Sequence, residues 1–212
     1  MSAVDALFAP DSPGPGTGTG SGGTRLRADA RRNVERLVAA ARAALDEAGR
    51  NVTTRDVARR AGVGLGTVYR RVPSLDALLS AILIDTIDEM TELAVRARDA
   101  AEDPWTAFVD FAEAYVRLRA SSCGLHDALS GPDDPELGRH IDRLREEVGH
   151  LVQRAQAAGA IRDEIDWQDV PFVLATAIPS DHTIGLTAKP DQWRRNLGII
   201  LDGLRPPPGT GA

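Results

Sequence analysis

The sequence contains a single cysteine, Cys123, so the chain cannot form an intramolecular disulfide bond. Aromatic residues make up only 4% of its 212 residues, so the core must be built from Leu, Val, Ile and Ala, which favours helices over a β-sandwich. No apolar run approaches the ~20 residues that a membrane span requires, and the N-terminus lacks the basic start and apolar stretch of a secretion signal. We therefore expect a soluble, cytoplasmic protein with no membrane partner.

Acidic residues outnumber basic ones by 31 to 25, and the net charge of −6 by itself argues against a nucleic-acid partner. The distribution of the charges reverses that conclusion. Residues 25–75 hold 12 Arg and 5 acidic residues, and the rest of the chain keeps 13 basic and 26 acidic ones. One segment is therefore strongly basic, and affinity for polyanionic DNA would be concentrated there.

Residues 53–71 predict two short helices folded around a glycine turn, the unit that places a helix in the DNA major groove. Thr53 and Asp56 form a Thr-x-x-acid start signal for the first helix. Gly62 has no Cβ and can adopt the positive φ of a sharp turn. The apolar positions that would pack the pair internally are Val57, Ala58, Ala61, Val63 and Val68.

The other positions of this segment carry mainly Arg, Thr and Tyr, side chains that suit phosphates and base edges. The alternative interpretation is that Tyr69 and Arg70 are ordinary surface residues of a packed helix pair. The candidate DNA-binding residues of the pair are Thr53, Thr54, Arg55, Gly64, Leu65, Gly66, Thr67, Tyr69, Arg70 and Arg71.

Helical periodicity extends over most of the remaining chain, and no segment alternates convincingly with period two. Residues 10–24 are almost entirely Pro, Gly, Ser and Thr and should be mobile, because they cannot offset the entropy of ordering. Pro179 should kink or end its helix early. The other predicted helices cover 29–48, 75–100, 104–120, 137–155, 169–184 and 190–204. The predicted fold class is all-α, a three-helix head followed by a helical body.

An aromatic cluster lies in the predicted helix that begins at Pro104. We interpret these residues as core, with the wall of a ligand pocket as the alternative. Met90 on the preceding helix is a further candidate for such a pocket. The cluster consists of Trp105, Phe108, Phe111 and Tyr115.

The body offers little that could support catalysis. Cys123 and His126 have C-x-x-H spacing, but two ligands make no closed metal site, so we expect no metal. His126 and His182 could each orient a ligand, although satisfied or exposed histidines are the simpler interpretation. We find no phosphate loop, dinucleotide fingerprint or nucleophile motif, and expect neither a cofactor nor a catalytic site. A small all-α enzyme that uses His126 or His182 as a base is kept as an alternative.

Residues 30–80 resemble the tetracycline-repressor (TetR) family of bacterial transcription regulators. The family pattern runs Thr-x-x-x-Ile-Ala-x-x-Ala-Gly-Val-Ser-x-Gly-Thr-x-Tyr-x-x-Phe and then Lys-x-x-Leu. Three positions depart from it: Gly64 stands where Ser is usual, Val72 where Phe is usual, and Leu75 where Lys or Arg is usual. The matching residues are Thr53, Val57, Ala58, Ala61, Gly62, Val63, Gly66, Thr67, Val68, Tyr69 and Leu78.

The resemblance implies a homodimer whose two heads enter successive major grooves of a near-palindromic operator. It implies that Thr54 and Tyr69 contact phosphates. The residues implied to approach bases or the adjacent backbone are Leu65, Gly66, Thr67 and Arg70. The residues that could follow the backbone or minor groove from an N-terminal arm are Arg25, Arg27 and Arg31.

The resemblance also implies a body with a small-molecule pocket and a four-helix dimer interface made by the last two helices of each copy. The candidate pocket residues are Met90, Trp105, Phe108, Phe111, Tyr115, His126 and His182. The candidate dimer residues are Leu174, Ile178, Trp193, Leu197, Ile200 and Leu201.

The sequence therefore predicts a homodimeric regulator of transcription that binds double-stranded DNA. We expect a repressor that an unknown small-molecule effector releases from an inverted-repeat operator, with a constitutive DNA-binding regulator as the alternative. The expected domains are a disordered tail over 1–24, a DNA-binding domain over 25–74, and an effector-binding and dimerisation domain over 75–206.

Overall fold

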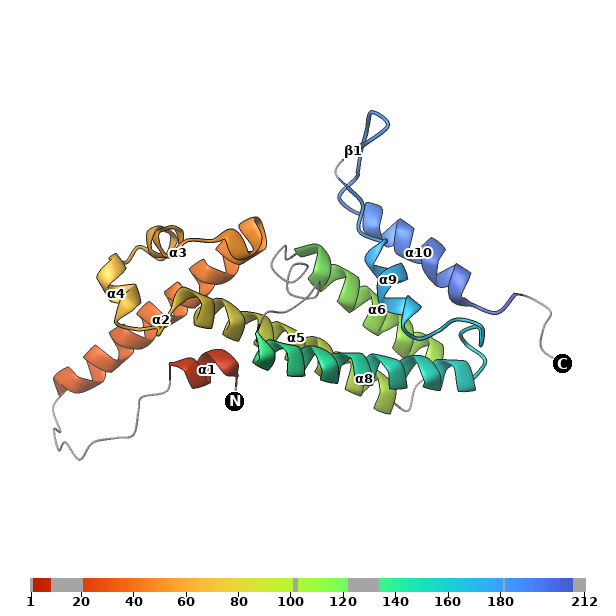
Figure 1. The fold of residues 1–212 in the computed structure, drawn as a ribbon, viewed down its shortest axis with the longest axis horizontal. Coiled ribbons are helices and arrows are strands. Elements are labelled where there is room, and N and C mark those ends of the chain that lie inside the picture. The colour runs from red at the N-terminus through yellow and green to blue at the C-terminus, as the bar shows by residue number, and fades with distance from the viewer. Residues whose placement is uncertain (1, 9–20, 101–102, 122–133, 181, 208–212) are drawn as a thin grey trace. The chain divides into compact units, whose positions relative to one another are not determined.

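The structure is a computed structural model that describes residues 2–8, 21–100, 103–121, 134–180 and 182–207. Over these residues the chain is helical except for one short hairpin and the connecting turns (Figure 1). The elements are α1 (Ala3–Leu7), α2 (Ser21–Ala48), η1 (Gly49–Asn51), α3 (Thr54–Ala61), α4 (Leu65–Tyr69), α5 (Leu75–Asp99), α6 (Pro104–Ser121), α8 (Pro135–Ala157), α9 (Asp169–Ala175), β1 (His182–Thr183), β2 (Leu186–Thr187) and α10 (Gln192–Leu204). The predicted all-α fold, a helix-turn-helix head followed by a helical body, is confirmed.

The chain forms two compact units. The first holds the residues up to Thr86 and a segment that ends at Leu137, and the second holds Ile87–Ser121 and the residues from Gly138 onward. Every helix among the residues that the structure describes is too short or too polar to span a lipid bilayer. The candidate DNA-binding residues belong to the first unit, whereas Met90, the aromatic cluster and the candidate dimer residues belong to the second.

Helix α2 is longer than the sequence predicts, because it begins at Ser21 and not at Asp29. The apolar stripe behind the prediction starts at Val34, so it gives no signal for the first two turns. Those turns begin with Ser, Gly, Gly and Thr, which are weak helix formers, so propensity does not predict this extension either. Gly49, with φ +58°, ends the helix as expected.

Helix α1 lies inside the segment predicted to be disordered. The Ser2 hydroxyl accepts a hydrogen bond from the Asp5 amide at 3.0 Å, and the Asp85 carboxylate on α5 accepts one from the Ala3 amide at 2.6 Å. These bonds satisfy amides in the first turn of α1. They help a short helix to form within the tail that was predicted to be disordered. Residues 9–20 of the predicted tail lie outside the described residues.

The second unit contains the later part of α5 together with α6, most of α8, α9 and α10. Helix α6 contacts both α9 and α10, and α9 contacts α10. The inward side of α8 repeats at helical spacing and ends where Gly159 adopts φ +67°, as predicted. Its buried residues in this unit are Ile141, Leu144, Val148, Leu151, Val152 and Ala155.

The helix predicted over 169–184 is wrong in its second half. Helix α9 ends at Ala175, and Pro179 follows in a non-helical connection, so the predicted early end of this helix at the proline is confirmed. Strands β1 and β2 then pair antiparallel, Thr183 opposite Leu186. Each strand has only two residues, which is too short for a period-two pattern to be detected.

Candidate nucleic-acid interface

Helix α3 starts at a capped end, as the sequence predicts. The Thr53 hydroxyl accepts a hydrogen bond from the Asp56 amide at 3.2 Å and donates one to the Asp56 carboxylate at 2.5 Å. The bond from Thr53 is the main reason that the pKa of the Asp56 carboxyl lies below its usual range. The cap fixes the residue at which α3 begins.

The turn between α3 and α4 has the geometry that Gly62 was predicted to supply. Gly62 adopts φ +66°, and the next amide, that of Val63, donates to the Ala58 carbonyl at 3.0 Å. Val57 and Val68 are completely buried, and Ala58 and Ala61 are nearly so. These contacts fix the position of α4 against α3, because both helices are too short to be stable alone.

Helix α4 turns its other side to solvent. Its Val68 is buried, whereas the next residue, Tyr69, is 68% exposed. The Arg70 Nε donates to the Gly66 carbonyl at 3.0 Å, which holds the guanidinium against the helix. A Cβ added at Gly64 or Gly66 would meet nothing within 4 Å, so the surface around them is open. A partner could therefore approach the α4 backbone closely.

All ten candidate residues of the helix pair are accessible. Thr54 and Thr67 are half-buried. The exposed ones are Thr53, Arg55, Gly64, Leu65, Gly66, Tyr69, Arg70 and Arg71. Their contacts with DNA stay a prediction.

Ion pairs divide the arginines of this unit into two groups. Arg59 pairs with Asp56 at 3.0 Å, and Arg60 pairs with Glu47 of α2, with a shortest distance of 2.5 Å. Arg55 and Arg71 have no acidic partner within ion-pair distance among the described residues. Among the described side chains of the head, no acidic residue therefore neutralises the charge of these two.

The N-terminal arginines lie on helix α2 and not on an extended arm. Arg25, Arg27 and Arg31 fall in its first three turns. A helix is too wide to enter the minor groove, so contact there would need a non-helical N-terminal arm. Contact with the phosphate backbone stays a prediction for these residues.

The departures from the family pattern occupy different environments. Val72 is buried, as expected for a packing residue at the position where the family has Phe. Leu75 is half-buried at the start of α5, where Ser74 caps the helix by accepting from the Ala77 amide at 3.1 Å. Gly64 precedes α4 with extended backbone and provides no side-chain cap.

The candidate pocket residues are mostly core. Met90, Phe108, Phe111 and Tyr115 are buried, and the Phe111 and Tyr115 rings lie 6.0 Å apart. Burial raises the pKa of the Tyr115 phenol, against a smaller opposing effect of Arg119. The half-buried Trp105 ring lies 6.0 Å from Phe108 and carries the Arg205 guanidinium 4.8 Å from its centroid.

The two candidate histidines do not join this cluster. His182 is exposed on the hairpin strand β1, as the simpler interpretation of this residue expected, and a role in a ligand site stays a prediction. The prediction placed it on a continuous helix, which in fact ends before Pro179. His126 lies outside the described residues.

The candidate dimer residues need a correction. Leu174, Leu197 and Leu201 are buried inside the unit, and Ile178 and Ile200 are half-buried, as is Trp193. Periodicity identified an apolar stripe, but Leu174, Leu197 and Leu201 of this stripe pack on the rest of the same chain. The large apolar side chains that α9 and α10 expose are Phe172 at 77% and Ile199 at 73%, both missed from the sequence.

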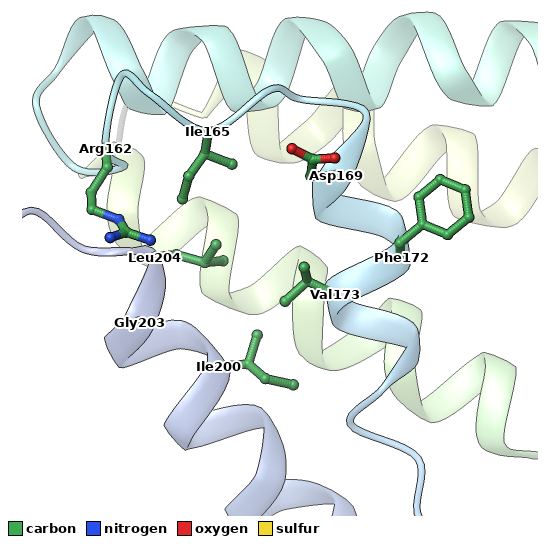
Figure 2. A pocket seen from close by; sticks show the side chains of 8 residues that line it. All are labelled: Arg162, Ile165, Asp169, Phe172, Val173, Ile200, Gly203 and Leu204. Atoms are coloured by element: carbon green, nitrogen blue, oxygen red, sulfur yellow. The ribbon is translucent and has the colours of Figure 1, made fainter.

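A hollow of about 460 Å³ lies between the outward sides of α9 and α10 (Figure 2). Val173 of α9 and Ile200 of α10 point toward one another across it, and Arg162 and Leu204 lie at one end. Its lining residues are Arg162, Ile165, Asp169, Phe172, Val173, Ile200, Gly203 and Leu204. The hollow is mainly apolar and does not include the aromatic cluster of α6.

Two family models match the chain. The model described as bacterial regulatory proteins, tetR family, covers residues 37–82, and the model described as transcriptional regulator SbtR-like, C-terminal domain, covers residues 103–206. An HTH-type transcriptional regulator of Mycobacterium tuberculosis is 34% identical over 83 residues. That match spans 38% of this chain and only 36% of the relative.

Solved structures extend the similarity over both units. A TetR transcription regulatory protein from Mycobacterium vanbaalenii is 33% identical, with a TM-score of 0.55, over 85% of this chain and 99% of that one. A TetR transcriptional regulator from Streptomyces coelicolor is 29% identical, with a TM-score of 0.58, over 81% of this chain and 98% of that one. These matches identify a regulator of transcription and not an enzyme. The chain belongs to the TetR family of DNA-binding transcriptional regulators.

Proposed function

We propose that the protein is a homodimeric repressor that binds an inverted-repeat operator and is released by a small-molecule effector. The observation that supports operator binding best is the two-sided character of α4, with Val68 completely buried and Tyr69 68% exposed. Arg55 and Arg71 add charge beside this surface that no acidic residue of the described chain neutralises. Two such heads would enter major grooves one helical turn apart.

The outward surface of α9 and α10 is the proposed dimer interface. Phe172 and Ile199 expose apolar surface there, and the hollow between the helices adds Val173 and Ile200. In a two-fold dimer the same surface serves both copies, so apolar side chains of one copy meet those of the other. The proposed domain division is the one expected from the sequence, with DNA binding in 25–74 and dimerisation and effector binding in 75–206.

Effector release is proposed as a population shift. The body would have two conformations, one that suits operator binding and one that does not. An effector that binds the second conformation more tightly lowers the affinity for DNA. The size of this decrease is limited by the difference between the effector's affinities for the two conformations. Coupling of ~1–3 kcal/mol would change the affinity by roughly 5–150-fold. The aromatic cluster of Trp105, Phe108, Phe111 and Tyr115 is the proposed wall of the site.

A constitutive regulator is the second candidate, and the burial of that cluster favours it. Phe108 is completely buried and Phe111 almost so, which leaves the cluster closed in this structure. A library of apolar small molecules, screened for a rise in the melting temperature of the purified protein, separates the two. A compound that raises the melting temperature and also weakens operator binding supports a repressor with an effector. If no compound in the library does both, the result favours the constitutive regulator.

Operator binding is tested with the Tyr69→Ala, Arg70→Ala double variant. Operators are first selected from a random DNA library with the wild-type protein, and affinities are then measured by fluorescence anisotropy. We expect the specific affinity to fall more than about 100-fold, since both side chains would contact DNA in each head. Arg143→Ala, an exposed arginine on α8, is the charge control. Unchanged affinity of the double variant would refute this placement of the recognition helix.

A further inference from the structure

The hairpin of β1 and β2 exposes apolar side chains that its own chain does not cover. Every residue of the two strands is exposed. Ile184 at the turn is 92% exposed, and Leu186 is 63% exposed. A two-stranded hairpin is marginally stable in water when it stands alone, so this one requires packing from another source.

The turn residue itself carries a backbone cost. Ile184 has φ +42° and Gly185 has φ +81°. A two-residue turn with both φ values positive favours Asn followed by Gly, and β-branched residues are disfavoured there. Ile184 is the one non-glycine residue with positive φ in the described ranges. Both exposure and backbone therefore disfavour isoleucine at this position in an isolated molecule.

The position of the hairpin indicates what covers it. It connects α9 to α10, the two helices of the proposed dimer interface, and extends past their ends (Figure 1). The hairpin therefore adds exposed apolar side chains to a part of the chain in which Phe172 of α9 and Ile199 of α10 are also exposed. A second copy of the chain, bound to the α9–α10 surface, would lie beside the hairpin and could cover it.

The size of the helical surface supports the same conclusion. Helix α9 has 7 residues and α10 has 13, and several of them are buried inside the unit. A stable interface usually takes about 20–30 residues from each partner. The outward residues of the two helices are too few to reach this number, and the hairpin is the adjoining segment that supplies more apolar surface.

We infer that residues 182–187 form a dimer arm, which lays Ile184 and Leu186 on the α9–α10 surface of a second copy of this chain. Two-fold symmetry makes the exchange reciprocal, so each dimer contains two such contacts. The inference rests on the proposed homodimer. It adds that the helices alone do not make the full interface.

Ile184→Asn tests the arm, because a surface turn and a dimer contact predict different results. Asn is better suited to positive φ than Ile, so the variant should fold at least as well as the wild type. We expect the dimer dissociation constant, measured by sedimentation equilibrium, to rise about 100-fold, because each dimer loses two buried apolar side chains. Leu65→Asn, which changes an exposed leucine of the head, is the matched control and should leave dimerisation unchanged. An unchanged dissociation constant for Ile184→Asn would overturn the inference.

Ile199→Asp separates the arm from the proposed interface. If Ile199→Asp yields monomers and Ile184→Asn does not weaken the dimer, the helical interface is right and the arm is wrong. If Ile199→Asp leaves the dimer intact, the proposed interface itself is wrong. Monomers from Ile199→Asp together with a weakened Ile184→Asn dimer support both.

Burial of the arm is measured directly by alkylation of Ile184→Cys in a Cys123→Ser background. We expect iodoacetamide to react about tenfold more slowly at concentrations where the protein is dimeric than after dilution to monomer. Ala157→Cys, an exposed position on α8, should react at the same rate in both conditions. Equal rates for Ile184→Cys before and after dilution would contradict an arm that lies on the partner.

Discussion

The guanidinium of Arg154 on α8 donates to the main-chain carbonyl of Ala97 at 2.9 Å, and to that of Ala100 at 2.6 Å. Carbonyls in the last turn of a helix have no partner within it, so Arg154 satisfies oxygens at the C-terminal end of α5. A cation there also interacts favourably with the helix dipole. Arg154 thus ties α8 to the end of α5.

Arg154→Ala should lower the free energy of unfolding by about 1–3 kcal/mol, because it leaves partly buried carbonyls without a donor. Denaturant unfolding followed by circular dichroism measures the change. Arg143→Ala on the same helix removes an exposed arginine and should change stability by less than about 0.5 kcal/mol. Equal effects from both substitutions would show that the carbonyl contacts contribute nothing.

Gly64 and Gly62 offer a matched pair of substitutions to serine. A Cβ meets nothing within 4 Å at either position, but Gly64 has ordinary extended backbone whereas Gly62 has φ +66°. Gly64→Ser should stabilise the head by a few tenths of a kcal/mol, because it supplies the missing cap of α4. Gly62→Ser should destabilise it by about 1 kcal/mol through strain.

Both variants are compared by thermal unfolding and by affinity for a selected operator. Gly64→Ser should also bind DNA more tightly, because the new hydroxyl lies at the surface proposed to meet the phosphates. A stabilising Gly62→Ser would mean that the turn changes conformation on substitution.

The helix-turn-helix could be predicted in detail because its determinants are local. Thr53 caps α3 by accepting from the amide three residues later, and Gly62 supplies the positive φ of the turn. Val57 and Val68 lie on two helices that only a short loop separates. Each of these features needs only a few neighbouring residues. The sequence therefore predicts both the elements and the side that they bury.

The dimer surface could not be predicted in the same way. Helix α10 has one apolar side with the buried Leu197 and Leu201, and a second side on which Ile199 is exposed. Periodicity shows that both are apolar, but only tertiary packing decides which one the chain covers itself. The same limit applies to Arg60, whose pairing with Glu47 depends on how α2 and α3 pack.

Tyr115 should make the body sensitive to alkaline pH. Burial raises the pKa of its phenol above the unfolded value of about 10, so folding favours the neutral form. The stability that this contributes is complete below about pH 10 and is lost as the pH rises through the folded pKa. Tyr115→Phe should show a smaller loss of melting temperature between pH 9 and pH 11 than the wild type. An identical alkaline loss in both proteins would assign the effect to other groups.

Arg55→Ala and Arg71→Ala should each weaken operator binding in a salt-dependent way. A protein that neutralises a phosphate releases a counterion, and the slope of log K against log salt changes by about 0.9 per contact. Each substitution removes two contacts from the proposed dimer, so we expect each slope to become shallower by roughly two units. The measurement is operator affinity by anisotropy between about 50 and 200 mM salt, with Arg143→Ala as a control that should keep the wild-type slope. A wild-type slope for both head variants would mean that the two unneutralised arginines do not meet the DNA backbone.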